Sequence, residues 1–130
     1  MTWTHFWDMY SGGGQKESFG HCYIEAPEAE AKVIFYKRFG HNPDRITCAC
    51  CGADYSIDES ETLEQATGYQ RGCKWRDDKY VEEPSSHAWE HYITLRDYIA
   101  SDDARVIYAA DIKDGERVGE IPEQGWAWVG

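Results

Sequence analysis

Apolar and polar positions alternate at the start of the chain and predict an extended strand over residues 2–10. The run Ser-Gly-Gly-Gly at residues 11–14 ends this strand. It lacks the lysine and the hydroxyl residue of a phosphate-binding loop, so it predicts a turn. The residues that share one face of the strand are Trp3, His5, Trp7 and Met9.

A short second strand at residues 21–25 precedes a helix with clear start and stop signals. Pro27 suits the first helical position, and Glu28 and Glu30 place negative charge in the first turn. Apolar residues follow on more than one side, up to Gly40, a typical left-handed stop. We expect this to be the central, buried helix.

The pattern then becomes less regular. Two strand ends, at residues 46–48 and 55–57, flank a Cys-rich turn. Asp58 and Glu61 have the spacing of a capping box, which predicts a short helix to about residue 66.

The last elements come from shorter signals. Residues 79–81 predict an edge strand inside a poorly patterned stretch, Thr94 with Asp97 marks another helix start, and residues 105–109 predict a final strand. The two Trp of the tail, at residues 126 and 128, share a face if the tail is extended. The expected class is α+β: one small domain over residues 1–130, with a short antiparallel sheet packed on a central helix and a Cys-rich knuckle.

Composition supports a folded domain with an aromatic surface or core. The chain has 130 residues, of which 42% are hydrophobic, enough to bury a core. Six Trp and nine Tyr raise the aromatic share to 15%, so we expect some rings to face a partner.

The negative net charge of the chain favours basic partners over nucleic acids. The formal net charge is −11, and residues 77–130 carry −8 of it against −3 for residues 1–76. This negative field repels phosphate backbones and steers a basic partner toward the C-terminal part. The N-terminus lacks a signal-peptide pattern and no apolar run is long enough for a membrane span, so we expect no membrane association.

The cysteines give the sharpest chemical signal. Cys48, Cys51 and Gly52 form a Cys-x-x-Cys-Gly unit, a tight turn that can place two thiolates on one zinc ion. Cys73 follows at about the separation of a second half-site. We expect a structural zinc site of Cys48, Cys51, Cys73 and His41, with no open position for a substrate water.

The metal and its fourth ligand have alternatives. An odd number of cysteines without an export signal favours reduced thiols over disulfides, and these thiols could be packed as small hydrophobes or have a redox or catalytic role. The other candidates for the fourth ligand are Cys50, Cys22, His21 and His87.

Two further groupings are weaker. His5 with Asp8, and His87 with Glu90 and His91, are possible acid and base pairs, although surface or core histidines explain them more simply. Basic residues interleaved with aromatic ones have some nucleic-acid-binding character, but solvation and pairing with nearby acids are the ordinary explanation. The two basic groups are Lys32, Lys37, Arg38 and Arg45, and Arg71, Lys74 and Arg76.

Several segments of the first 75 residues or so resemble a group of small uncharacterised proteins encoded by bacteriophages of actinobacteria. The segments are residues 3–9 with 11–14, 25–28, 33–36, 38–43, 47–52 with 54–57, and 68–69 leading to 71–73. The resemblance implies a phage context but no activity.

Together these observations predict a non-enzymatic, phage-encoded binding protein in the cytoplasm of an infected host cell. It would dock on a host or defence protein through exposed rings and an acidic surface, as an inhibitor or an acidic nucleic-acid mimic. The alternatives are a small metal-dependent enzyme that uses the Cys and His groups, and a zinc-containing nucleic-acid-binding module that uses the basic residues around Lys37 and Arg71.

Overall fold

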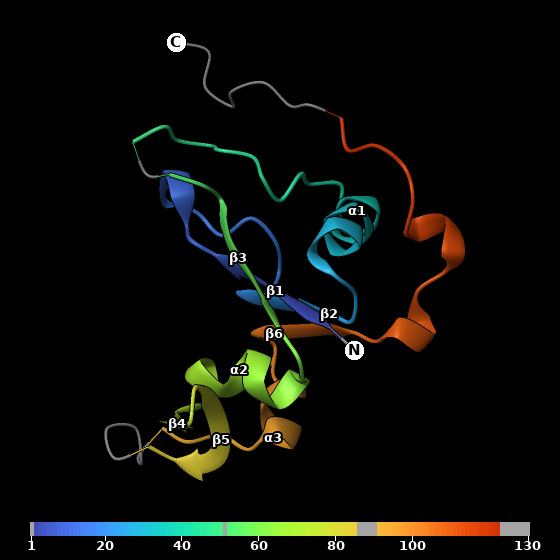
Figure 1. The fold of residues 1–130 in the computed structure, drawn as a ribbon. Helices are drawn as coiled ribbons and strands as arrows, with labels where there is room; N and C mark the ends of the chain where they lie inside the picture. Colours follow the sequence, from blue (N-terminus) through green and yellow to red (C-terminus); the bar gives the residue numbers. More distant parts are fainter. Residues whose placement is uncertain (1, 51, 86–90, 123–130) are drawn as a thin grey trace.

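A four-stranded sheet forms the centre of the computed structural model, which describes residues 2–50, 52–85 and 91–122 (Figure 1). The strand order is β3-β1-β2-β6, with β1 antiparallel to both β2 and β3 and with β6 parallel to β2. The α+β prediction is confirmed, and the parallel β6 makes the sheet mixed. The strands are β1 (Trp3–Asp8), β2 (His21–Ile24), β3 (Tyr55–Ser60) and β6 (Ala104–Ile107).

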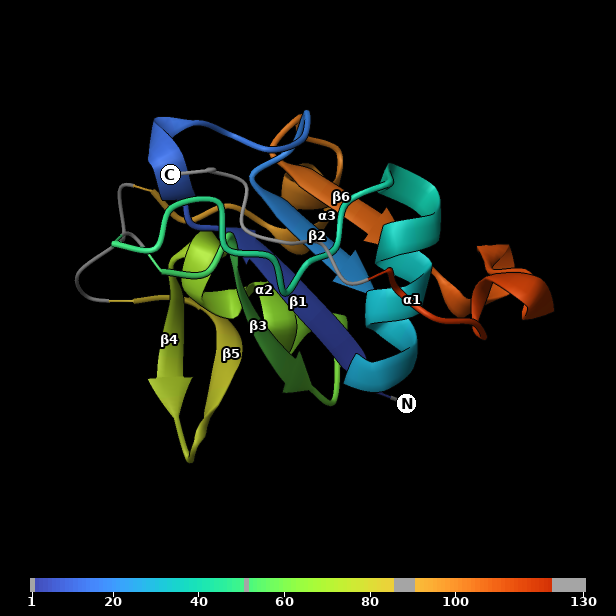
Figure 2. The ribbon, with the colours of Figure 1, turned by 90° about the horizontal axis from the view of Figure 1, so that it is seen from above.

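Helices cover both faces of this sheet. Figures 1 and 2 show α1 (Glu28–Phe39) on one face and α2 (Leu63–Arg71) with α3 (Leu95–Ile99) on the other. A separate hairpin of β4 (Cys73–Arg76) and β5 (Lys79–Pro84) packs beside α2. Three short 3₁₀ helices complete the described elements: η1 (Ser11–Gly13), η2 (Ala109–Asp111) and η3 (Asp114–Glu116).

The acidic first turn and the glycine stop predicted for α1 are confirmed: Glu28 and Glu30 lie in the first turn, and Gly40 ends the helix with a left-handed φ of 71°. Pro27 is the N-cap, one position before the first helical position predicted for it. The side chains of Ala31, Ile34 and Phe35 are buried against the sheet, so α1 covers one face rather than being surrounded by protein.

The start of α2 differs from the sequence prediction. β3 continues through Asp58 to Ser60, and the N-cap is Thr62, whose side chain accepts a hydrogen bond from the Gln65 amide. The Asp58 and Glu61 pair is therefore not a capping box, because β1 holds Asp58 in the sheet opposite His5. Residues 46–48 are not a strand either; Cys48 makes only an isolated bridge to Gly52.

Alternation along the strands gives the two faces different interiors. Toward α1 lie apolar and aromatic side chains, including Phe6, Cys22, Ile24, Phe35 and Ile107. Toward α2 and α3 the core is smaller, with Trp3, Tyr23, Leu63, Ala66, Tyr98 and Ala104. Among the described helices, none combines the length and the apolar character that a membrane crossing needs.

Candidate functional site

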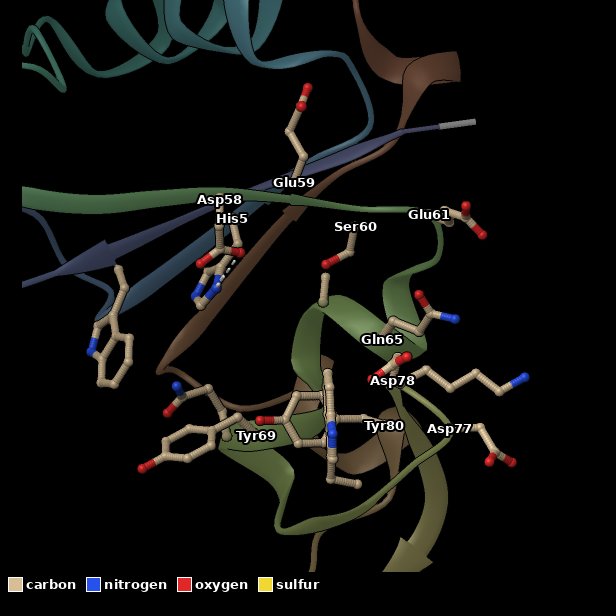
Figure 3. Close-up of a pocket in the computed structure, with 15 residues that line it drawn as sticks. His5, Asp58, Glu59, Ser60, Glu61, Gln65, Tyr69, Asp77, Asp78 and Tyr80 are labelled. Carbon is tan, nitrogen blue, oxygen red and sulfur yellow. Dashed lines mark ion pairs between the residues drawn. The ribbon is translucent and has the colours of Figure 1, made fainter.

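A groove of about 610 Å³ opens between the sheet face toward α2, the helix α2 itself and the β4–β5 hairpin (Figure 3). We call this cavity the groove. Its described residues come from β1 and, about 50 residues further along the chain, from β3, α2 and the hairpin, so it exists only in the folded chain. The described residues that line it are His5, Trp7, Asp58, Glu59, Ser60, Glu61, Gln65, Ala66, Tyr69, Gln70, Trp75, Asp77, Asp78, Lys79 and Tyr80.

The hairpin wall depends on a two-residue turn. Asp77 and Asp78 have φ of 52° and 62°, the left-handed pair of a type I′ turn, whose twist matches that of the strands it joins. This turn sets the register that places Trp75 opposite Tyr80. It also holds two carboxylates at the end of the groove (Figure 3).

A glycine on α2 brings the hairpin close. A Cβ added at Gly68 would lie 2.2 Å from the Tyr80 Cβ and 2.5 Å from its Cγ, closer than any relaxed contact. Only glycine therefore lets Tyr80 rest directly on the helix backbone. The neighbouring residue, Tyr69, projects into the groove beside Tyr80 (Figure 3).

Four aromatic rings form a continuous row along the groove. The centroids of Trp75 and Tyr80 are 4.6 Å apart, those of Tyr80 and Tyr69 are 6.4 Å apart, and those of Tyr69 and Trp7 are 6.1 Å apart. The rings are inclined to one another by 70°, 67° and 43°, so they present faces in several directions. Trp75 and Tyr69 remain 58% and 64% exposed, which is high for rings in a packed row.

The lining is strongly acidic. Among the described residues that line it, five are acidic, Asp58, Glu59, Glu61, Asp77 and Asp78, and one, Lys79, is cationic. The carboxylate of Glu59 points away from the cavity and accepts a hydrogen bond from the Glu28 amide (Figure 3). Burial raises the pKa of Asp58, and the nearby charge of Glu28 adds to this. A positive group in the groove would therefore relieve the cost of holding these charges together.

Beneath the groove, two histidines join across β1 and β2. His5 Nε2 and His21 Nδ1 are 2.9 Å apart, a buried hydrogen bond between rings. On the far sides, His5 Nδ1 lies 3.8 Å from Asp58 and His21 Nε2 lies 3.8 Å from Asp103. The result is a row of carboxylate, two imidazoles and carboxylate, which we call the histidine row; its groove end, His5 with Asp58, is drawn in Figure 3.

Burial keeps both rings of the histidine row neutral. It lowers the pKa of His5 to about 3, with repulsion from His21 adding to the effect, and it lowers the pKa of His21 despite the attraction of Asp103 and Asp8. The carboxylates lie beyond hydrogen-bond distance of the rings, so their attraction does not outweigh the desolvation. Tyr23 stacks on His5 with centroids 4.5 Å apart, which fixes the ring further.

Sequence reasoning did not find the histidine row. It paired His5 with Asp8, but successive strand residues alternate in direction, and the Asp8 carboxylate accepts hydrogen bonds from the amides of Tyr10 and Lys16 instead. The signal was present in the pattern, because His21 begins the next strand and antiparallel pairing places it near Trp7 and His5. His91 is exposed, and its predicted companions His87 and Glu90 lie outside the described residues.

Of the four predicted zinc ligands, the three that the structure describes, Cys48, Cys73 and His41, are not gathered into one site. Cys48 lies in the loop after α1, where its Sγ is 3.0 Å from that of Cys50, whereas Cys73 is buried at the start of β4. Figure 1 places this loop and β4 at opposite ends of the molecule. Cys51 lies outside the described residues.

His41, which was predicted to join the cysteines as a zinc ligand, lies beside a carboxylate. Its Nε2 lies 3.1 Å from Oδ2 of Asp54, a fully buried carboxylate that also accepts hydrogen bonds from the amide and hydroxyl of Thr47. Asp54 thus organises the loop that carries Cys48. Burial lowers the pKa of His41 and, separately, raises that of Cys73.

The alternative ligands are also dispersed. Cys22 is buried in the core under α1, where burial raises its thiol pKa, and His21 belongs to the histidine row. His87 lies outside the described residues, and those that are described contain no group of three His, Cys, Asp or Glu side chains placed to hold a metal ion. Zinc binding stays a prediction, to be tested by elemental analysis of the purified protein and by melting curves with and without a chelator.

Most residues of the two predicted basic groups pair with acidic side chains of the same chain. Lys32 contacts Glu28 and Asp44 at 3.2 Å, and Arg38 contacts Glu116 at 2.7 Å. In the second group, the fully buried Arg71 binds Glu82, and both Lys74 and Arg76 contact Glu83. These cations therefore tie segments of the chain together.

Comparison with known proteins gives no assignment: no family model matches the chain, and neither does any curated protein or solved structure.

Proposed function

We propose that the chain is a non-enzymatic binding protein that docks on a positively charged segment of another protein through the groove. The observation that carries this proposal is the row of four rings, Trp75, Tyr80, Tyr69 and Trp7, inside an acidic cavity. Aromatic residues in a concave site are the usual anchors of protein interfaces, and a rim of one charge selects a partner of the other.

The chemistry of the groove favours binding over catalysis. The one imidazole in its described lining, His5, directs Nε2 at His21 and Nδ1 toward Asp58, and burial lowers its pKa far below the range of a general base near neutral pH. The carboxylates Asp77 and Asp78 are adjacent turn residues rather than a facing pair. These features supply attraction for a cation without an assembled set of reacting groups.

The resemblance of some segments to phage proteins supports a proposed partner among the host or defence proteins of an infected bacterial cell. Its negative charge, concentrated beyond residue 76, steers such a partner electrostatically. We expect the association to weaken as salt is added, because exposed charges are screened at high ionic strength.

Affinity capture from host lysate at low salt, with matched variants, tests this function. The wild-type protein and Tyr10→Ala should retain the same partner, since Tyr10 is equally exposed but lies outside the described lining of the groove. Trp75→Ala should lose it, with the affinity for the purified partner falling at least about tenfold, the size of a modest hot spot. Melting curves of each variant establish that it is folded.

Two outcomes would contradict the proposal. One is that no protein is enriched over a mock column at low salt. The other is that Trp75→Ala, while folded, binds the partner as well as Tyr10→Ala does, because the contact would then lie elsewhere on the surface.

A further inference from the structure

The exposed aromatic rings of the groove suit a planar chemical group better than a compact tetrahedral one. Trp75 and Tyr80 meet at 70° and Tyr80 and Tyr69 at 67°, so neighbouring rings form corners rather than a closed stack. A planar group can lie on one ring while its edge faces the next. The exposed areas of Trp75 and Tyr69 leave such ring faces accessible.

Carboxylates stand at two separated places around these rings. Asp58 projects from β3 on the sheet side, while Asp77 and Asp78 stand at the hairpin turn (Figure 3). A group that stacks on the rings and still has donors at its edge can reach these oxygens. Donors in a fixed fork match a carboxylate with two hydrogen bonds.

We propose that the groove binds the guanidinium of an arginine side chain, presented by the partner segment. This inference rests on the proposed function and names the chemical group that the groove recognises. Guanidinium is planar, stacks on aromatic faces and sheds water more easily than the compact ammonium of lysine.

The same contact already occurs inside this molecule. The guanidinium of Arg105 lies 5.4 Å from the ring centroid of Phe19 and 5.8 Å from that of Phe39. Those two rings are also steeply inclined, at 61°. The rings of Tyr80 and Trp75 form a corner of similar inclination, in a groove whose lining includes acidic residues.

A small-molecule titration tests the inference without the partner. The probes are blocked arginine, blocked lysine and blocked citrulline, the last having the planar shape of arginine without its charge. The readout is the ¹⁵N-indole resonances of Trp7 and Trp75, with the buried Trp3 as an internal reference outside the described lining of the groove.

We expect blocked arginine to shift the Trp7 and Trp75 signals saturably and to bind about tenfold more tightly than citrulline, the range of a cation on an aromatic face. Trp75→Ala should abolish the shift of Trp7. Asp77→Asn with Asp78→Asn should weaken binding severalfold, whereas Asp102→Asn, an exposed acid outside the described lining, should not.

The inference is overturned if arginine gives no saturable shift at tens of millimolar. It is equally overturned if citrulline matches arginine, since stacking alone would explain the binding, or if lysine binds as tightly, since charge alone would suffice. A groove-dependent partner without arginine binding would leave the proposed function standing and remove this inference. If the groove binds arginine but binding of the partner is insensitive to Trp75→Ala, the arginine site stands and the proposed function is removed.

Discussion

The two faces of the central sheet are built on opposite principles. The face toward α1 is closed by aromatic packing: Phe6, Phe39 and Tyr55 surround Phe35 with ring centroids 4.6 to 5.1 Å away. The face toward α2 carries the histidine row and then opens into the groove. Packing on the α1 face thus offsets the free-energy cost of the buried histidines and of the exposed rings and carboxylates on the α2 face. Such a division is common at functional sites.

Among variants that test this difference between the faces, we expect the largest loss of stability from Phe35→Ala. Removing a fully buried ring from the α1 face should cost about 3–5 kcal/mol of unfolding free energy, because a cavity remains among the neighbouring rings. The control Tyr36→Ala, at a half-buried position on the same helix, should cost much less. Chemical denaturation measures both, and similar costs would show that α1 is not anchored through Phe35.

Lowering the pH should destabilise the protein through the histidine row, on the sheet face toward α2. His5 and His21 have folded pKa values below the unfolded value of about 6.5. Their contribution to stability is therefore fully present above that pH and is lost as pH falls toward about 3, the folded pKa of His5. We expect a loss on the order of 2–3 kcal/mol between pH 6.5 and pH 4 from this source.

The variant His5→Asn isolates that contribution from the carboxylates, which also titrate in acid. Its unfolding free energy should fall less steeply over the same pH range than that of the wild-type protein. Parallel curves would mean that the histidine row is not desolvated as the geometry implies.

Gly68→Ala tests the seam between α2 and the hairpin. At an unhindered helical site this change gains up to about 1 kcal/mol, from the lower conformational freedom of alanine. Here the added methyl meets Tyr80, so we expect a loss of about 1–3 kcal/mol, together with altered signals from Trp75. Gly115→Ala, with open space around its Cβ, should be close to neutral, and equal effects at the two sites would contradict the close packing.

The smallest effect is expected at the hairpin turn. Asp77→Asn with Asp78→Asn removes two charges from the groove but keeps residues that accept left-handed φ, which a type I′ turn needs. Stability should change by no more than about 0.5 kcal/mol, as for ordinary surface sites. A larger loss in thermal melting would mean that the carboxylates also hold the hairpin together.

Local features of the fold could be predicted from the sequence because their causes are local. Proline and acids at the start of α1, Gly40 at its end and Thr94 before α3 act within one helical turn. The strand over residues 2–10 follows from alternation alone, and β1 occupies most of it. The tail with its two Trp lies outside the described residues.

The groove could not be predicted, because it depends on contacts between distant segments. Asp58 has the spacing of a helix cap, and only the pairing of β3 with β1 makes it a strand residue facing His5. Tyr69 and Trp75 lie beside the basic residues Arg71 and Lys74 in the sequence. Their alignment in one row through Tyr80 needs the hairpin register and the close contact of Tyr80 with Gly68. Sequence spacing likewise suggested a shared site for Cys48 and Cys73, which the fold separates (Figure 1).

The parallel pairing of β2 with β6 has a consequence for how the chain is made. It joins His21 to Ala104 and Ile24 to Ile107, partners about 80 residues apart. At translation rates of about 5–20 residues per second, β2 leaves the ribosome roughly 4–16 s before the strand that completes it. During that time the edge of β2 that later pairs with β6 has no strand beside it, although the four residues of β2 are buried in the folded protein. Slow translation, or a stop before residue 104, should therefore increase chaperone binding or aggregation of the nascent chain.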